Sequence, residues 1–228
     1  MTRDVTHKGR VIIFDDHSLF SYTIDIALSQ HGLEVQTFDV GPQTTADDIV
    51  SAAKKFEPDV VVLDLHLGAA IENARFLIPE LSTESTEVIV VTGDRDEFQI
   101  AGCISDGAAC VLGKDISFEV FVSTILRVLH KEPVVPLARR EELKRMWRTY
   151  ESSKRTALEP FTHLSPREQE VLAALVAGKS ANTIADELYM SVSTVRSHIH
   201  SILNRLQVNS QLEAVAKALH SQWAPTRC

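Results

Sequence analysis

Along residues 1–130, short runs of β-branched and aliphatic residues alternate with segments whose apolar positions recur at helical spacing. Unbroken runs are typical of strands buried on both faces of a parallel sheet, and an alternating run is typical of an edge strand. The pattern predicts strands at 10–14, 33–38, 59–65, 87–92 and 108–112, of which 33–38 belongs at an edge of the sheet. It predicts helices at 17–31, 46–56, 73–81, 96–103 and 118–130. Five alternating pairs predict a flavodoxin-like, doubly wound, five-stranded parallel sheet.

The end of the chain shows helical spacing alone. Ser165, Pro166 and Glu168 form a helix start, with serine as the N-cap, proline at the first position and glutamate at the third. Further helices are predicted at 182–188, from Ser191 or Ser193 to about residue 206, and at 210–220. Short helices joined by a tight turn predict an all-α, four-helix domain with a helix-turn-helix, whose third helix would enter the major groove.

A basic segment joins these two parts. Pro133 and Pro136 end the α/β pattern, and residues 137–158 are rich in Arg, Lys and Glu at helical spacing. This segment could be an arm that contacts DNA, but a linker helix that packs its few apolar residues on a neighbouring domain is favoured. The predicted domains are therefore 1–130, a partly helical linker 131–162, and 163–228.

Carboxylates follow two of the predicted central strands. Asp15 and Asp16 follow the first strand, and Asp64 ends the third. In a doubly wound sheet these two strand ends are neighbours at the point where the strand order reverses, so the three side chains should meet. Their mutual repulsion would be relieved by Mg²⁺, which suits a site with few carboxylates, waters and a phosphate.

The fourth and fifth predicted strands supply hydrogen-bond donors at the same end of the sheet. Thr92 ends the fourth strand, and Lys114 follows the fifth. An isolated aspartate after a strand would more often cap the next turn. An aspartyl phosphate, however, needs a nucleophilic carboxylate, a metal and donors to the phosphoryl oxygens, and all three are predicted here. We therefore interpret Asp64 as a phosphoacceptor, with Thr92 and Lys114 as the groups that meet the phosphoryl oxygens.

The predicted third helix of the last domain has an apolar stripe through Val195, Ile199 and Ile202. Its outward positions include Thr194, Arg196, Ser197, His200 and Ser201. Arginine can contact guanine or phosphate, and serine and histidine can reach base edges or phosphate oxygens. In an isolated helix the same pattern would be a solvated face.

Charge is distributed unevenly over the 228 residues. The net charge of −8 divides into −12 for residues 1–130, +3 for 131–162 and +1 for 163–228. This asymmetry suggests domains with different partners. The sequence has no apolar run long enough for a membrane span and no apolar amino-terminal leader, which predicts a cytoplasmic protein. The spacing of Cys103, Cys110 and Cys228 argues against a disulfide framework or a zinc site.

Together these motifs carry a family resemblance. Residues 10–130 resemble the receiver domain of bacterial two-component response regulators, which is marked by Asp15 and Asp16, Asp64, Thr92 before Gly93, and Lys114. The resemblance implies phosphorylation of Asp64 from a histidine kinase. It also implies that Asp16, Asp64 and the backbone carbonyl of His66 bind Mg²⁺, while Asp15 assists through water.

A second resemblance covers about residues 163–220. The sequences at 164–172, 178–180, 184–185 and 193–199 resemble the LuxR/NarL-type DNA-binding domain, so the chain resembles a NarL/FixJ-type response regulator. The resemblance implies base or backbone contacts by Arg196, Ser197 and His200, and phosphate contacts near Ser193 and Thr194. It further implies a homodimer on promoter DNA, for which the candidate residues are Leu212, Val215, Ala216 and Leu219.

The receiver pattern also shows departures. The usual proline after the phosphoacceptor is missing, Val111 stands where an aromatic residue is usual, and Gly113 directly precedes Lys114. The first two favour an alternative, an orphan regulator that binds DNA largely independently of phosphorylation. A phosphatase of the haloacid dehalogenase type would need a second aspartate two residues after Asp64, where this chain has His66. It would also leave the helix-turn-helix without a role, so we do not expect an enzyme.

Overall fold

The structure is a computed structural model that describes residues 9–69 and 71–225, except for the side chain of Phe20. The chain forms two compact units, residues 1–148 and residues 149–228, each of which is described by itself. Cys228 lies outside the described residues. None of the helices in the described ranges combines the length and the apolar character that crossing a membrane requires.

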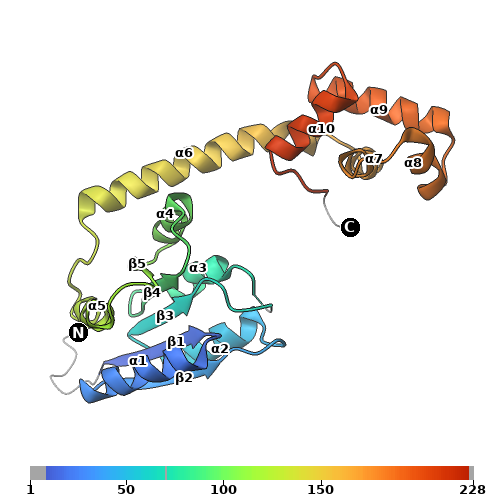
Figure 1. The fold of residues 1–228 in the computed structure, drawn as a ribbon. Helices are drawn as coiled ribbons and strands as arrows, with labels where there is room; N and C mark the ends of the chain where they lie inside the picture. The colour runs from blue at the N-terminus through green and yellow to red at the C-terminus, as the bar shows by residue number, and fades with distance from the viewer. Residues whose placement is uncertain (1–8, 70, 226–228) are drawn as a thin grey trace. The chain divides into compact units, whose positions relative to one another are not determined.

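The first unit is built on a parallel sheet (Figure 1). Its strands are β1 (Arg10–Asp15), β2 (Glu34–Asp39), β3 (Val60–Asp64), β4 (Glu87–Thr92) and β5 (Cys110–Gly113). They lie in the order β2-β1-β3-β4-β5, and every neighbouring pair is parallel. The predicted doubly wound fold is confirmed, and β2 is the predicted edge strand. The strand order reverses between β1 and β3, which places their carboxyl ends side by side.

Helices cover both faces of this sheet. They are α1 (Ser18–Gln30), α2 (Ala46–Phe56), the 3₁₀ helix η1 (Ala74–Leu77), α3 (Ile78–Leu81), α4 (Glu97–Ser105) and α5 (Phe118–Leu129). One core cluster joins α2, η1, α3 and part of α4 to one face, and a second joins α1 and α5 to the other. Successive residues of β1 enter opposite clusters, with Ile12 in the first and Ile13 in the second. The central strands are buried on both faces, as their unbroken apolar runs indicate.

The predicted helix at 73–81 is wrong in detail. It begins as η1, and only Ile78–Leu81 is α-helical. Pro79 has no N–H to donate to the carbonyl of Arg75, so an α-helical ladder cannot run through this position. The amide of Ile78 instead bonds to the Arg75 carbonyl with 3₁₀ spacing.

Helix α6 (Leu137–Thr162) is longer than the predicted 137–158 and contains Pro160 near its end. Its first part belongs to the first unit, where Leu143 and Trp147 are buried. The linker helix was expected to bury its few apolar residues in this way.

The second unit holds α7 (Pro166–Val176), α8 (Ala181–Glu187), α9 (Val192–Leu206) and α10 (Gln211–His220). Its core takes apolar residues from all four helices and from the end of α6. Each of the four helices begins with a serine N-cap, at Ser165, Ser180, Ser191 and Ser210. For α9 the structure therefore selects Ser191 between the two predicted caps. The predicted four-helix domain is confirmed.

Ser165 and Glu168 form a complete capping box at the start of α7. We expect Ser165→Ala to destabilise the second unit by about 1 kcal/mol, because an amide at the helix start loses its acceptor. This corresponds to a fall of about 4–8 °C in the thermal midpoint of a unit of this size, measurable by calorimetry. Ser153→Ala, the same change on the exposed interior of α6, should leave the midpoint unchanged or slightly raised. Equal midpoints for the two variants would contradict this role of the box.

Candidate phosphoacceptor site and DNA-recognition helix

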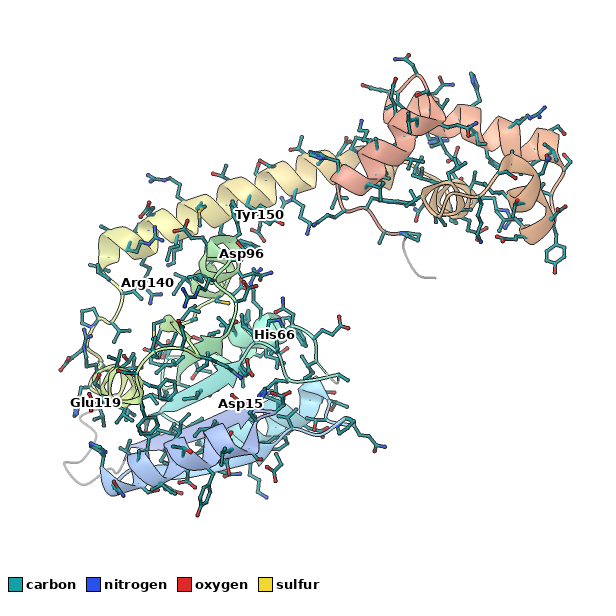
Figure 2. The ribbon with its side chains drawn as sticks, viewed as in Figure 1. Asp15, His66, Asp96, Glu119, Arg140 and Tyr150 are labelled. Atoms are coloured by element: carbon teal, nitrogen blue, oxygen red, sulfur yellow. The ribbon has the colours of Figure 1, made fainter. Side chains whose placement is uncertain are left out.

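Acidic groups gather at the carboxyl ends of β1 and β3. Oxygens of Asp15, Asp16 and Asp64 and a ring nitrogen of His17 all lie within 4.8 Å of one another. Asp15 and Asp64 are 4% and 2% exposed, although both are carboxylates. Figure 2 shows Asp15 and His66 at the same end of the sheet. The structure thus brings together the three aspartates that the strand order predicts to meet.

These groups border an open pocket of about 530 Å³. It is lined by Asp16, His17, Asp64, His66, Gly68, Glu72, Gly93 and Lys114. The lining comes from the last residue of β3 and from the loops that follow β1, β3, β4 and β5. A small, charged, solvent-open pocket of this kind suits an anionic group held beside a cation.

Lys114 supplies the positive charge inside the cluster. Its Nζ lies 2.6 Å from Oδ2 of Asp64 and 3.3 Å from Oδ2 of Asp15. Its backbone amide donates to the carbonyl of Thr92 at 2.9 Å, which fixes the loop after β5 to the end of β4. Gly113 suits this tight turn, since a Cβ there would lie 2.5 Å from Oδ1 of Asp115.

Both buried carboxylates also accept bonds from the backbone. The amide of His17 donates to Oδ1 of Asp15 at 2.7 Å, and the amide of His66 donates to Oδ1 of Asp64 at 3.1 Å. Asp64 therefore caps the turn after β3 as well as facing the pocket. The turn fixes one oxygen, and Oδ2 remains on the side of Lys114.

Thr92 is 2% exposed at the end of β4, next to Val91, which is the register partner of Asp64. Its Oγ1 accepts a hydrogen bond from the amide of Asp94 at 3.0 Å. Its neighbour Gly93, rather than Thr92 itself, lines the pocket. Because the oxygen is the acceptor in this bond, the hydroxyl proton can still be donated to another group.

The protonation of the central pair follows from burial and charge. Burial raises the pKa of Asp64, and the charge of Asp15 adds to this, against the hydrogen bonds from Lys114 and from the His66 amide. Burial alone would lower the pKa of Lys114, but its hydrogen bond to Asp64 and the charges of Asp64 and Asp15 raise it overall. Lys114 therefore stays charged, and the Asp64 carboxylate is held in a site that disfavours its charge.

The donor set fits a hard cation. Oδ2 of Asp15 is buried and accepts no hydrogen bond within the described residues, and its contact with Lys114 is an ion pair at 3.3 Å. A cation would satisfy this oxygen with the carboxylates of Asp16 and Asp64 close by. His17 is a neighbour that the sequence interpretation missed. Its Nδ1 lies 2.7 Å from Oδ1 of Asp16, and its position directly after the acidic pair was the available signal.

Helix α9 carries the candidate DNA-contacting residues of the second unit. Val195, Ile199, Ile202 and Leu206 are buried on one face. The side chains on the other face are exposed at the predicted positions Ser193, Thr194, Arg196, Ser197 and His200. Ser191 caps the helix through the amide of Thr194 at 3.1 Å. This divides α9 into a core face and a polar face, as the pattern predicts.

The candidate dimer residues on α10 differ in their exposure to solvent. Leu212 and Leu219 are 78% and 61% exposed, and Ala216 is exposed between them. Val215 is half-buried and packs against the core of the second unit. Three of the four candidates thus form an exposed apolar stripe.

Two known families match parts of the chain. The family described as "Bacterial regulatory proteins, luxR family" matches residues 162–218, which hold α7, α8, α9 and most of α10. The family described as "B12 binding domain" matches residues 11–114, less than half of the chain. The second match agrees with the α/β fold of the first unit and covers none of the second.

A relative over the whole length decides the family. "Probable transcriptional regulatory protein NarL" of Mycobacterium tuberculosis is 30% identical over 227 residues, covering 97% of this chain and 99% of that protein. The chain belongs to the NarL-type response regulators. The resemblance expected from the motifs is thereby confirmed.

Other proteins match this response regulator over similar lengths. "Transcriptional regulatory protein DegU" of Brevibacillus brevis is 24% identical over 234 residues, covering 97% of each chain. A solved structure of the response regulator RcsB in complex with DNA covers 94% of this chain and 99% of that chain, at 20% identity and a TM-score of 0.49.

The buried charge of Asp64 should lower the thermal stability of the first unit. Because its pKa is raised in the folded state, ionisation at pH 7 destabilises the fold, so Asp64→Asn should be the more stable protein without divalent cations. We expect a gain on the order of 1 kcal/mol, or about 2–4 °C in the thermal midpoint of the first unit. The gain should disappear in acid, below the pKa of the unfolded chain, because both side chains are then uncharged.

Asp48→Asn is the matched control with the opposite sign. The side chain and backbone of Thr45 hydrogen-bond to Asp48 and lower its pKa, so the ionised form stabilises the fold and its loss should lower the midpoint. Mg²⁺ should raise the midpoint of the unmodified chain more than that of Asp64→Asn. A lower midpoint for Asp64→Asn in chelator would contradict the conclusion that the ionised Asp64 side chain destabilises the fold.

Proposed function

We propose that this response regulator controls transcription by binding promoter DNA, and that phosphorylation of Asp64 by a histidine kinase in the presence of Mg²⁺ switches its activity. The observation that carries the proposal is the contact of Lys114 with Asp64 and Asp15, because Lys114 and Asp64 line an open pocket. This arrangement pairs a buried nucleophilic carboxylate with a cation that remains charged.

The chemistry follows from the contacts of Asp64. In the transfer, the phosphorus–nitrogen bond of the donor breaks as a carboxylate oxygen of Asp64 bonds to phosphorus, and the donor nitrogen keeps the electron pair. Asp64 Oδ2 is the oxygen that faces the pocket, because the amide of His66 holds Oδ1. Lys114 then exchanges its ion pair with the carboxylate for a phosphoryl oxygen, and the Thr92 hydroxyl donates to another.

The metal would be held by Asp15, Asp16, Asp64 and the backbone carbonyl of His66. When bound, Mg²⁺ neutralises the charge that gathers on the phosphoryl oxygens. The buried, unbonded Oδ2 of Asp15 supports this placement. The role of the chain is to regulate, and we propose no substrate turnover beyond this self-modification.

The second unit would bind double-stranded promoter DNA through α9. Arg196, Ser197 and His200 are proposed to contact bases or backbone, and Ser193 and Thr194 to contact phosphates. We propose domain borders at 1–130, 131–162 and 163–228. We also propose a cytoplasmic protein, since both promoter DNA and the kinase must reach it.

A homodimer is the proposed DNA-binding form. The exposed stripe of Leu212, Ala216 and Leu219 on α10, with Val215 at its border, is the candidate interface. A contact between two copies of this stripe would bury its exposed leucines, and removing their apolar surface from water would stabilise the dimer.

The alternative function is DNA binding that is largely independent of phosphorylation. Val111 is the observation that favours it, because its half-buried side chain packs against the first core cluster and has no aromatic ring that could act as a switch. The two functions differ in whether phosphorylation changes DNA affinity.

The switch is tested by incubating the full chain with Mg²⁺ and acetyl phosphate, then measuring intact mass and affinity for promoter DNA on the same sample. We expect the mass of one phosphoryl group to be gained, and DNA affinity to change about 10-fold. Asp64→Asn should show neither effect. A mass gain without any change in affinity or oligomeric state would support the alternative function, and no mass gain would overturn the switch.

Recognition by α9 is tested with Arg196→Ala. We expect promoter affinity to fall about 10-fold or more, because one arginine contact is worth about 1–3 kcal/mol. Arg155→Ala is the matched control, since Arg155 is also exposed but lies on α6. Fluorescence anisotropy with labelled promoter DNA measures both. Equal losses for the two variants would show that α9 is not the recognition helix.

A further inference from the structure

Arg75 joins three elements of the first unit. Its side chain, 18% exposed, leaves η1 shortly after the pocket loop, and its Nε lies 2.6 Å from Oδ2 of Asp106 at the end of α4. Its guanidinium carbon lies 3.9 Å above the centre of the Trp147 ring on α6. One side chain thus contacts both α4 and the helix that leads to the second unit.

The backbone of Arg75 is fixed to the strand end that carries Asp64. The amide of Ala74 donates to the carbonyl of Leu65 at 2.8 Å, and the amide of Arg75 donates to the side chain of Asn73 at 3.0 Å. The loop between these anchors provides His66, Gly68 and Glu72 to the pocket wall. Arg75 therefore directly follows the backbone bond that closes the pocket loop.

The guanidinium of Arg75 packs closely against helix α4 at Gly102. A Cβ built on Gly102 would lie 2.5 Å from Cζ of Arg75, so the absence of a side chain at this position makes room for Arg75. Asp106 is the C-cap of the same helix and receives the ion pair. Helix α4 follows the loop after β4, and this loop begins directly after Thr92.

The first turns of α6 are held to the same region. Leu143 and Trp147 are 3% and 8% exposed. Arg140 donates to the carbonyl of Ala108 at 3.1 Å, and Figure 2 shows it among the side chains between α6 and the sheet. Arg139 pairs with Glu97 at the start of α4. These contacts attach helix α6 to the start of α4 and to the segment just after its end.

We propose that Arg75 is the positioning residue that couples the Asp64 pocket to helix α6, by linking the loop after β3 and the end of α4 to Trp147. The inference rests on the proposed phosphorylation of Asp64. Phosphorylation displaces the pocket loop, changes the contact of Arg75 with Trp147, and so changes how α6 is held on the first unit. This route runs through η1 and does not require an aromatic residue at position 111.

The test uses the full chain with Trp223→Phe, so that Trp147 is the remaining tryptophan. Intact mass, Trp147 emission with its quenching by acrylamide, and promoter affinity are measured before and after acetyl phosphate and Mg²⁺. In this background we expect phosphorylation to change Trp147 emission and quenching, and to change DNA affinity about 10-fold. In Arg75→Gln, the mass gain should remain, the Trp147 response should be lost, and the affinity change should fall below about 3-fold.

Two further variants separate coupling from folding. Gly102→Ala should also lose the Trp147 response, because its methyl group displaces the guanidinium, while alanine in place of glycine suits the helix. Arg10→Gln is the matched control. Arg10 also stacks on an aromatic ring, with its guanidinium carbon 4.4 Å from the Phe56 centroid, but at the opposite end of the sheet, and it should keep the response.

The outcomes distinguish this inference from the function on which it rests. No mass gain in the unmodified background overturns both. A mass gain with an affinity change overturns the inference alone if Trp147 does not respond, or if either Arg75→Gln or Gly102→Ala keeps the full response. Loss of the response in Arg10→Gln as well would also overturn it, because the effect would then come from general destabilisation.

Discussion

Two buried carboxylates at one edge of a parallel sheet are the constraint on which the first unit depends. Asp15 and Asp64 are almost completely removed from water, and the ammonium of Lys114, carried by the loop after β5, offsets part of their charge. A core built for stability alone would not place them there, since burying a charge costs more than its pairing usually returns. The part of their charge that Lys114 does not offset is the physical reason why the proposed cation would stabilise this site.

The same constraint explains the form of the surrounding loops. The oxygens of Asp15 and Asp64 that face away from Lys114 accept backbone amides of the turns that follow, so each carboxylate also determines the path of its loop. Asp64 therefore supplies a hydrogen-bond acceptor to its loop as well as a charge to the site. The chain that follows Asp64 next forms η1, and the guanidinium of Arg75 in η1 contacts Trp147 of helix α6.

Much of the fold and of the site could be predicted from sequence, because the signals are local or follow from strand order. The unbroken run in β3 indicates burial on both faces, and the capping box of Ser165 and Glu168 marks the start of α7. The meeting of Asp15 with Asp64 follows from the reversal of strand order.

The remainder depends on tertiary packing between distant segments. The contact of Arg75 with Trp147 carries no local pattern, because it needs the glycine at position 102 and the ion pair with Asp106 at once. The reason for a glycine at position 113 depends on the conformation of the turn, since a Cβ there would lie 2.5 Å from Oδ1 of Asp115. The 3₁₀ turn before Pro79 could have been predicted, because proline has no amide hydrogen for an α-helical bond. The helical spacing of the neighbouring apolar residues favoured an α-helix instead.

The central claim is that the buried carboxylate at the end of β3 is the phosphorylated group. Its most direct test is reduction of the acetyl phosphate-treated chain with borohydride, followed by peptide mass mapping, because an aspartyl phosphate is reduced to homoserine whereas an unmodified aspartate is not. We expect homoserine at position 64, dependent on Mg²⁺. Homoserine at another aspartate, or at none, would contradict it.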